Sequence, residues 1–288
     1  MNDVNAIELN HISKKYKEFQ VEDVSFTVPK GYITGFIGPN GSGKSTIIRM
    51  ILDAVRPDEG DIRIFNEPNH KAHLREKIGF VYDTLHIYED FNLKKAKAFI
   101  SEVYPSWDDE LYQKYVDRFE LPERKKLKKF SKGMKMKASL LFALSHRPEL
   151  IIMDEPTAGL DPIFRRELLD ELQNLMINEN QSIFFSTHIT QDLDQIADHI
   201  VFIYKGRLQF QKTIDEIRSK FFLVKGQTNQ LDADLKKILK GYKKTSQNFT
   251  GLYEGDPSIF EGLEDEFIIE QATLEDIMYY TTRRERAK

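Results

Sequence analysis

The sequence predicts an α/β domain with a largely parallel sheet, because short continuous apolar runs alternate with helical patterns along the chain. Residues 32–37, 149–153 and 182–186 are such runs, as expected of strands covered on both faces. Residues 45–52 and 162–177 carry apolar side chains at helical spacing, so each is expected to form a helix packed on that sheet.

Further elements are expected around these strands. Residues 6–9 and 24–28 alternate or run apolar, which favours two strands at the start of the chain. The stretch 92–145 is mostly helical in pattern, although two prolines and a basic segment interrupt it. Residues 199–210 are expected to form two strands joined at Lys205-Gly206.

The composition of the chain changes after about Phe210, where the sequence becomes more polar. We therefore expect residues 1–210 to form the main domain, with a helical subdomain over about 85–145, and residues 211–288 to form a small α+β accessory domain. The expected accessory elements are strands at 221–224 and 266–269 and helices at 231–239 and 273–280.

Composition excludes several classes of protein. Apolar residues make up 40% and charged residues 31%, which suits a globular protein with a sizeable core. The net charge of −4 does not suggest a nucleic-acid-binding protein. No cysteine is present, so thiolate metal sites and cysteine nucleophiles are excluded. The first ten residues lack a basic signal-peptide start, and no apolar run reaches the ~20 residues that cross a bilayer.

A phosphate-binding loop follows the first buried strand and matches G-x-x-x-x-G-K-[ST]. Its residues are Gly38, Pro39, Asn40, Gly41, Ser42, Gly43, Lys44, Ser45 and Thr46. Glycines let backbone N–H groups surround phosphates, and the helix N-terminus adds a favourable dipole. Lys44 is expected to reach the β- and γ-phosphates, Ser45 to bind Mg²⁺ and Thr46 to hold the α-phosphate. The strand before and the helix after the loop argue against a chance glycine turn.

Two more strands end in polar residues, where α/β sheets place their ligands. Residues 150–155 end in Asp154, expected to complete the Mg²⁺ shell, and Glu155, expected to act as general base on water. His188 follows the strand 182–186 and is expected to hold the γ-phosphate and the attacking water. Each strand end alone would be an ordinary solvated terminus; beside the loop they predict one ATP site.

The order of these motifs resembles the ABC ATPase family over residues 5–215. Between the loop and Asp154 stands Phe130-Ser-Lys-Gly-Met134, and after Glu155 stands Pro156-Thr-Ala-Gly-Leu-Asp161. The resemblance implies that Ser131 and Gly133 form a signature loop, which caps the γ-phosphate bound by the opposite chain of a head-to-tail dimer. It implies that Asp161 belongs to the D-loop, which links the two sites. Tyr16 stands where an aromatic side chain stacks on adenine, but it equally fits a tyrosine at a strand edge.

The sequence departs from the family pattern in two places. Lys132 and Met134 replace the usual glycine and glutamine of the signature. Asp83 stands where a glutamine is expected; a carboxylate can bind Mg²⁺ but donates no hydrogen bond at neutral pH. Coupling between nucleotide and partner is therefore expected to differ from the family norm.

The Ser-Lys-Gly-Met-Lys form of the signature, together with Tyr104-Pro-Ser-Trp107, is similar to the bacitracin-type bacterial exporter ATPases, whose membrane subunits are separate chains. Within that branch the chain looks similar to the Pmt-type ATPases of staphylococci, which export phenol-soluble modulins. The resemblance implies an ATPase at the cytoplasmic face of the cell membrane that binds ATP and Mg²⁺. The resemblance also implies that this ATPase acts as a homodimer or a heterodimer on a polytopic membrane subunit and serves the export of an antimicrobial or amphipathic peptide.

Two other functions are compatible with the motifs. A soluble ABC ATPase of translation would normally carry two cassettes, and one of chromosome maintenance would carry a long coiled coil between the loop and Asp154; this chain has neither. A regulatory subunit that binds ATP but hardly hydrolyses it is suggested by Asp83 and Lys132, whereas Glu155 and His188 argue against it. The cargo, the choice between homodimer and heterodimer, and the role of 211–288 are not encoded in recognisable motifs.

Overall fold

The computed structural model of the chain describes residues 5–82, 85, 87–178, 181–263 and 265–283. Its contacts divide the chain into two compact units. The first contains Met1–His188 and Val201–Gln211, and the second contains Ile189–Ile200 and Lys212–Lys288. Helix α6 (Thr190–Ile196) thus belongs to the second unit, although it lies inside the stretch 1–210. It packs on α9 of that unit, and sequence patterns carry no information on such a distant contact.

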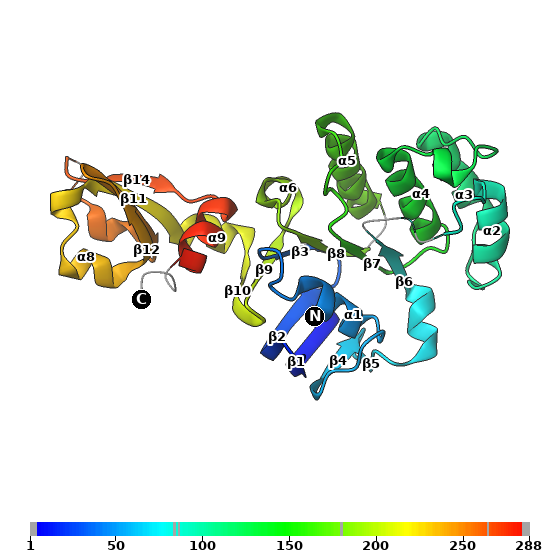
Figure 1. Cartoon of the computed structure of the whole chain (residues 1–288), viewed down its shortest axis with the longest axis horizontal. Helices are drawn as coiled ribbons and strands as arrows, with labels where there is room; N and C mark the ends of the chain where they lie inside the picture. Colours follow the sequence, from blue (N-terminus) through cyan, green and yellow to red (C-terminus); the bar gives the residue numbers. More distant parts are fainter. Residues whose placement is uncertain (1–4, 83–84, 86, 179–180, 264, 284–288) are drawn as a thin grey trace. The chain divides into compact units, whose positions relative to one another are not determined.

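A six-stranded sheet organises the first unit (Figure 1). Strands β3, β8, β7 and β6 are parallel neighbours in that order. The sheet consists of β10 (Arg207–Thr213), β9 (His199–Tyr204), β3 (Ile33–Ile37), β8 (Ser182–Thr187), β7 (Leu150–Asp154) and β6 (Ile78–Val81). The parallel α/β architecture expected from the buried runs is confirmed.

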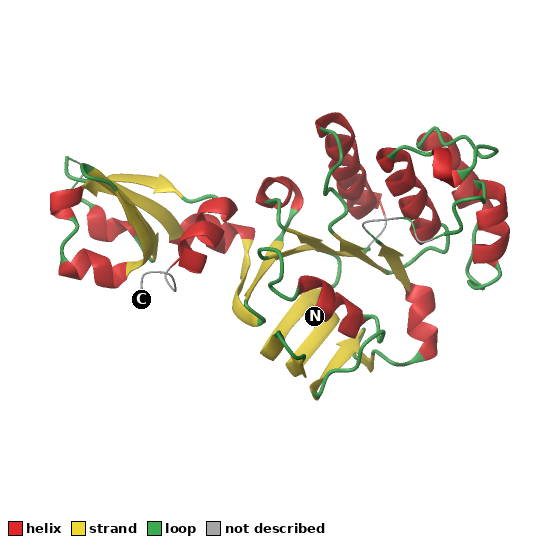
Figure 2. Ribbon diagram, in the orientation of Figure 1, coloured by secondary structure: helices red, strands yellow, loops and turns green. Residues whose placement is uncertain are grey.

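A second, antiparallel sheet packs below it, with α1 (Lys44–Ile51) between the two sheets (Figure 2). Its strands are β2 (Gln20–Pro29), β1 (Asn5–Lys15), β4 (Glu59–Ile64) and β5 (Glu67–Pro68). Phe26 of β2 and Phe36 of β3 both pack on Phe184 of β8, with ring centroids 5.9 and 5.2 Å from its own. These rings join the two sheets into one core.

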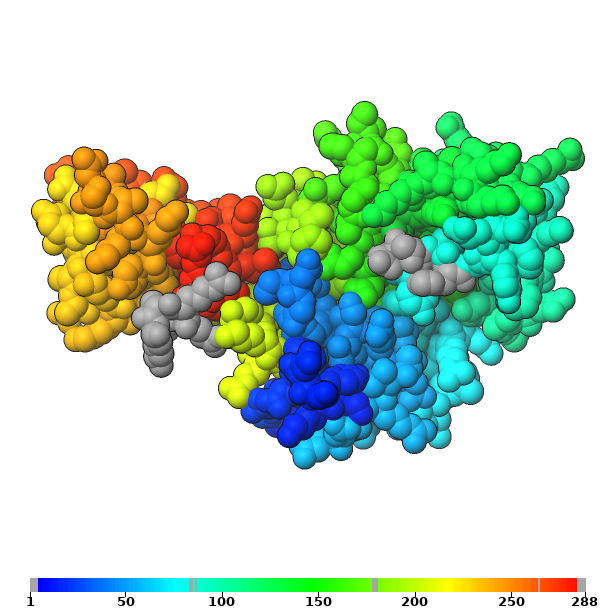
Figure 3. All heavy atoms as spheres, in the orientation of Figure 1, coloured from blue at the N-terminus to red at the C-terminus, as the bar shows by residue number. Residues whose placement is uncertain are grey.

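Helices form the remaining layer of the first unit. In Figure 3 the green side chains of this layer and the blue side chains of the antiparallel sheet lie at opposite sides of the unit. The helices are α2 (Leu93–Ser101), α3 (Asp109–Arg118), α4 (Lys132–Leu144) and α5 (Pro162–Asn178), with short 3-10 helices at Ala72–Lys77 and Leu127–Lys129. Asn92, Asp108 and Ser131 each begin a helix by accepting a backbone N–H with the side chain.

The second unit has an antiparallel sheet with its own core. Its strand order is β12 (Leu239–Lys244), β13 (Asn248–Glu254), β11 (Phe221–Gln227) and β14 (Ile268–Gln271). The helices are α6, α7 (Ile214–Lys220), α8 (Ala233–Ile238) and α9 (Leu274–Arg283), with 3-10 helices at Thr228–Gln230 and Pro257–Phe260. The sequence pattern missed β12 and β13, whose turn-rich segments show little apolar alternation.

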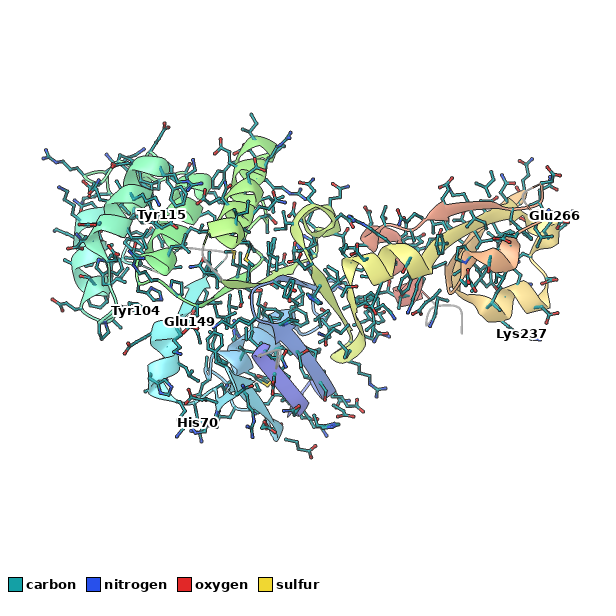
Figure 4. All side chains as sticks on the ribbon, turned by 180° about the vertical axis from the view of Figure 1, so that it is seen from behind. His70, Tyr104, Tyr115, Glu149, Lys237 and Glu266 are labelled. Atoms are coloured by element: carbon teal, nitrogen blue, oxygen red, sulfur yellow. The ribbon has the colours of Figure 1, made fainter. Side chains whose placement is uncertain are left out.

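The topology places the predicted site at one edge. Strands β3, β7 and β8 are parallel, so their carboxyl ends meet, and these ends lead into Gly38, Asp154 and His188. The N-terminal end of β7 is held by Glu149, labelled in Figure 4, whose carboxylate lies 2.8 Å from Lys30 Nζ and 3.0 Å from Lys77 Nζ. No helix in the described part of the chain has the length and apolarity that crossing a bilayer requires.

Candidate nucleotide-binding and hydrolysis site

The loop after β3 has a backbone that only glycine adopts easily. Gly41 and Gly43 have φ of 78° and 110°, in the left-handed region. A Cβ on Gly43 would lie 2.9 Å from the Phe19 ring, and a Cβ on Gly38 would lie 2.4 Å from the Ile203 carbonyl oxygen. The α1 N-terminus has no side-chain cap, so its first N–H groups remain available to an anion.

The backbone of Ser42 makes hydrogen bonds within the loop and to a neighbouring segment. Its N–H donates to the Pro39 carbonyl over 3.1 Å, and its own carbonyl accepts from Gly206 N over 2.9 Å. Its hydroxyl is buried and, among the described residues, has no hydrogen-bond partner. The fit to phosphate lies instead in the left-handed glycines and the uncapped N-terminus of α1, so the loop suits the triphosphate predicted for it.

Lys44 points back across this loop. Its side chain is 6% exposed, and its Nζ donates to the Gly38 carbonyl over 2.7 Å. The same Nζ lies 3.2 Å from Glu155 Oε1. A cation that contacts both the loop and the carboxylate at the end of β7 is placed to meet phosphate charge between them.

Glu155, which follows β7, contacts residues that follow the other two strands, Lys44 after β3 and His188 after β8. Its φ of 51° lies in the left-handed region, a sparsely populated conformation for a non-glycine residue. Its backbone N–H donates to the Ser186 carbonyl, and its Oε2 lies 2.7 Å from His188 Nδ1 and accepts from His188 N over 3.2 Å. The side-chain carboxylate therefore bridges Lys44 and His188, as required of a group that orients water beside the phosphate loop.

Asp154 and Ser45 supply oxygen ligands suited to Mg²⁺. Asp154 Oδ1 accepts a hydrogen bond from Ser186 Oγ over 2.6 Å, whereas its Oδ2 has no hydrogen bond among the described residues. Ser45 is exposed at the first turn of α1. A carboxylate oxygen and a hydroxyl oxygen match the preference of a hard cation, so these residues fit the ion. Asp83, the third predicted ligand, lies outside the described residues.

The signature residues lie elsewhere in the chain. Ser131 caps α4 by accepting from Met134 N over 3.2 Å, and a Cβ on Gly133 would lie 3.0 Å from the Phe164 ring of α5. Asp161 caps α5 by accepting from Phe164 N over 3.0 Å. Within the described residues no hydrogen bond joins Ser131, Gly133 or Asp161 to the phosphate loop, so one chain assembles only part of the predicted set.

The other predicted residues occupy the rim of the loop. Tyr16 is 43% exposed in the β1–β2 hairpin, where its N–H donates to Phe19, the residue whose ring packs on Gly43. Asn40 is exposed, and Pro39 and Thr46 are half-buried.

Sequence reasoning missed two supports of the site. Ser186 donates to Asp154 and also accepts from Glu155 N over 3.1 Å, so it positions both carboxyl residues. The Ile203–Gly206 segment and Phe19 press against the loop glycines. The available signal for Ser186 was a polar side chain inside the buried strand β8. The two loop contacts join residues far apart in the chain, so the sequence carries no signal for them.

Comparison with known proteins agrees with this geometry. The family model described as ABC transporter matches residues 21–158. The chain is 31% identical over 221 residues to the ABC transporter ATP-binding protein YtrB of Bacillus subtilis, covering 76% of this chain and 75% of that one. This chain belongs to the ABC transporter ATP-binding proteins. It is therefore an ATP-binding ATPase subunit of the ABC transporter family, as its motifs predicted.

Two further relatives of this ABC ATPase refine the comparison. The bacitracin transport ATP-binding protein BcrA of Bacillus licheniformis is 32% identical, over 74% of this chain and 72% of its own. A solved ATP-binding subunit of an ABC transporter is 30% identical, with a TM-score of 0.67 over 74% of this chain and 92% of that one. The predicted resemblance to bacitracin-type ATPases is confirmed.

Proposed function

We propose that this ABC ATPase powers a bacterial exporter whose membrane subunit is a separate chain. The observation that carries the proposal is the Glu155 carboxylate, which lies between Lys44 and His188 at the edge of the phosphate loop. A carboxylate in this position can accept a proton from water that attacks the γ-phosphate. The site is thus equipped to hydrolyse ATP as well as to bind it.

Each residue of the site has a proposed task. Glu155 takes the proton of the attacking water, and His188 orients that carboxylate and the γ-phosphate. Lys44 neutralises the charge that develops on the phosphoryl oxygens. Ser45 and Asp154, with Asp83, hold Mg²⁺, which when bound neutralises phosphate charge. The backbone of 38–43 and Thr46 hold the remaining phosphates, and Tyr16 stacks on the adenine.

The second half of each site is proposed to come from another chain. Ser131 and Gly133 begin α4, a helix of 13 residues with no acidic residue in its first turn. Such an N-terminus favours an anion, and among the described residues no hydrogen bond joins it to the phosphate loop of its own chain. A head-to-tail dimer, of identical or paralogous chains, would place it on the γ-phosphate of the opposite site, with Asp161 between the two sites.

Export at the membrane is proposed from the relatives. The chain is similar to BcrA, a bacitracin transport ATP-binding protein. No helix in the described residues is long and apolar enough to cross a bilayer. We propose that the chain works peripherally at the cytoplasmic face of the membrane, binds no nucleic acid, and serves the export of an antimicrobial or amphipathic peptide.

The test is to tag the chain in its native host and identify what accompanies it from detergent-solubilised membranes. We expect to recover a polytopic membrane protein in stoichiometric amount. Deletion of the gene for that membrane protein should release the tagged chain from the membrane fraction. Exclusive recovery from the soluble fraction with ribosomes or DNA would instead assign the ATPase to a soluble ABC function.

A further inference from the structure

The side chain of Lys132, which stands where the family signature usually has a glycine, packs against a second functional segment of the same chain. A Cβ built on Gly159 would lie 2.6 Å from Lys132 Nζ, 3.7 Å from its Cε and 4.0 Å from its Cδ. These three atoms are the nearest neighbours of that position, so the end of the lysine side chain lies on Gly159. Helix α4 begins at Lys132 and α5 begins shortly after Gly159, and the two helices lie side by side (Figure 1).

The contact depends on glycine at one position and on a long side chain at the other. Gly159 has φ of 68°, in the left-handed region that glycine adopts easily. A methyl group there would occupy the space that Lys132 Nζ fills. Among the described residues the Lys132 ammonium has no hydrogen bond or ion pair, so the contact is one of packing. Lysine commonly packs its hydrocarbon stem in this way while its charge stays in water.

Gly159 lies in the short segment that follows Glu155, the proposed base. Two turn hydrogen bonds hold this segment: Ala158 N–H donates to the Glu155 carbonyl over 3.1 Å, and Leu160 N–H donates to the Thr157 carbonyl over 3.2 Å. Glu155 itself has the strained φ of 51°, a conformation that persists only where the surrounding structure holds it. A shift of Gly159 would therefore reach the backbone of Glu155 through these turns.

A second contact joins the same two parts of the chain. A Cβ on Gly133, next to Lys132, would lie 3.0 Å from the Phe164 ring of α5. Lys137 of α4 lies over that ring, 5.0 Å from its centroid, and 3.3 Å from Glu167 of α5. The signature end of α4 and the start of α5 are thus packed together, and Lys132 extends this packing to the segment 156–161.

We propose that Lys132 is a positioning residue for ATP hydrolysis, whose side chain holds the segment 156–161 and thereby the carboxylate of Glu155. Ser186 accepts from the Glu155 N–H, and Lys132 acts on the same residue from its carbonyl side. A misplacement of a reacting group by about 1 Å can cost about 100-fold in rate. A partial shift should therefore lower kcat, while KM for ATP stays unchanged because the phosphate loop is untouched. The inference rests on the proposed role of Glu155 as base.

The test is a double-mutant cycle on the full chain, with kcat and KM for ATP measured in each variant. Lys132→Ala should lower kcat about fivefold and change KM less than about twofold. Lys132→Met keeps the length of the side chain and should restore at least about half of the kcat. Gly159→Ala should also lower kcat, because its methyl group displaces Lys132. In the double variant the loss should be at least about threefold smaller than the product of the two single losses.

Two control variants separate this contact from strain and from charge. Gly31→Ala has similar strain at φ 85° but no atom within 4 Å of the added Cβ, so its effect should multiply with that of Lys132→Ala. Lys125→Ala removes an exposed lysine of the same helical layer and should keep the unmodified kcat. Thermal unfolding checks that every variant is folded.

Hydrogen exchange gives a readout that does not require turnover. The amides of Ala158 and Leu160 should exchange faster in Lys132→Ala and return to the unmodified rate in Lys132→Met, because the turns lose and regain their support. The proposal is overturned if Lys132→Ala keeps the unmodified kcat, if Lys132→Met loses as much kcat as Lys132→Ala, or if the losses in the cycle simply multiply.

Glu155→Gln distinguishes failure of this inference from failure of the proposed base. A lost kcat in Glu155→Gln together with an unmodified kcat in Lys132→Ala would overturn the role of Lys132 alone. An unmodified kcat in Glu155→Gln would overturn the role of the base and, with it, the positioning role that rests on it.

Discussion

Glu155 Oε2 lies 2.7 Å from His188 Nδ1, so the residues that directly follow the neighbouring strands β7 and β8 are held together at the sheet edge. The same carboxylate reaches Lys44 through its other oxygen, at 3.2 Å. This bridge joins the ends of β7 and β8 to the phosphate loop after β3. A water molecule bound beside it would meet an acceptor, a cation and the phosphate site together.

Glu155→Gln should abolish most of the ATPase activity while leaving ATP binding intact. The amide keeps the size of the side chain but cannot accept a proton from water, a loss of at least about 100-fold in kcat. Steady-state phosphate release and equilibrium binding of a fluorescent ATP analogue measure the two properties. Glu149→Gln, at the other end of β7, should keep the unmodified kcat, and an unchanged kcat in Glu155→Gln would sink the assignment of the base.

Ser186→Ala should lower kcat about tenfold with little change in KM for ATP. The hydroxyl positions Asp154 and the backbone of Glu155, so its loss misplaces both carboxylates without removing either. Ser182→Ala is the matched control, because Ser182 begins the same strand and its Oγ accepts from Gly31 N far from the site. Equal kcat values in the two variants would show that Ser186 is merely a buried strand residue.

Gly43→Ala should weaken ATP binding strongly. An alanine would carry backbone strain of about 1–3 kcal/mol at φ 110° and would press its Cβ on the Phe19 ring. Gly31→Ala is the control, since φ there is 85° but no atom lies within 4 Å of the added Cβ. Both variants should lose stability in urea denaturation, yet only Gly43→Ala should lose affinity for ATP. Normal ATP affinity in Gly43→Ala would contradict the need for glycine in the phosphate loop.

Phe184→Ala should destabilise the first unit by about 3–5 kcal/mol, because Phe184 is fully buried between the rings that join the two sheets. Phe99→Ala, at a side chain that is 63% exposed, should change the free energy of unfolding by less than about 0.5 kcal/mol. Chemical denaturation of both variants gives the comparison. A small effect at Phe184 would mean that the sheets are held together elsewhere.

The contribution of Glu149 to stability should disappear in acid. Its hydrogen bonds with Lys30 and Lys77 hold its pKa below the ordinary value of 4.5, against the opposing effect of burial. A carboxylate with a lowered folded-state pKa stabilises the protein above the unfolded pKa, and this stability is lost as pH falls through the folded value. The Tm difference between the unmodified chain and Glu149→Gln should therefore be present at neutral pH and shrink below pH 4.5.

The exposed Glu102 provides the control for this pH dependence. Glu102→Gln should follow the unmodified chain at every pH, because Glu102 has no ion-pair partner among the described residues. A Tm difference for Glu149→Gln that stays constant from neutral pH to pH 3 would contradict the role of its charge.

The sequence by itself determined the parallel sheet, the phosphate loop and the three strand ends that form the site. These features depend on local signals: fully apolar runs, a glycine-rich turn and polar residues at the ends of buried strands. The family follows from the same motifs, because their order along the chain is a property of sequence.

Only the tertiary structure decided which of these residues touch. It brought Glu155 to Lys44 and His188, added Ser186 beneath them and grouped α6 with the second unit. The physical reason is that contacts between residues far apart in the chain depend on how sheets and helices pack, and local patterns of apolarity do not record that packing.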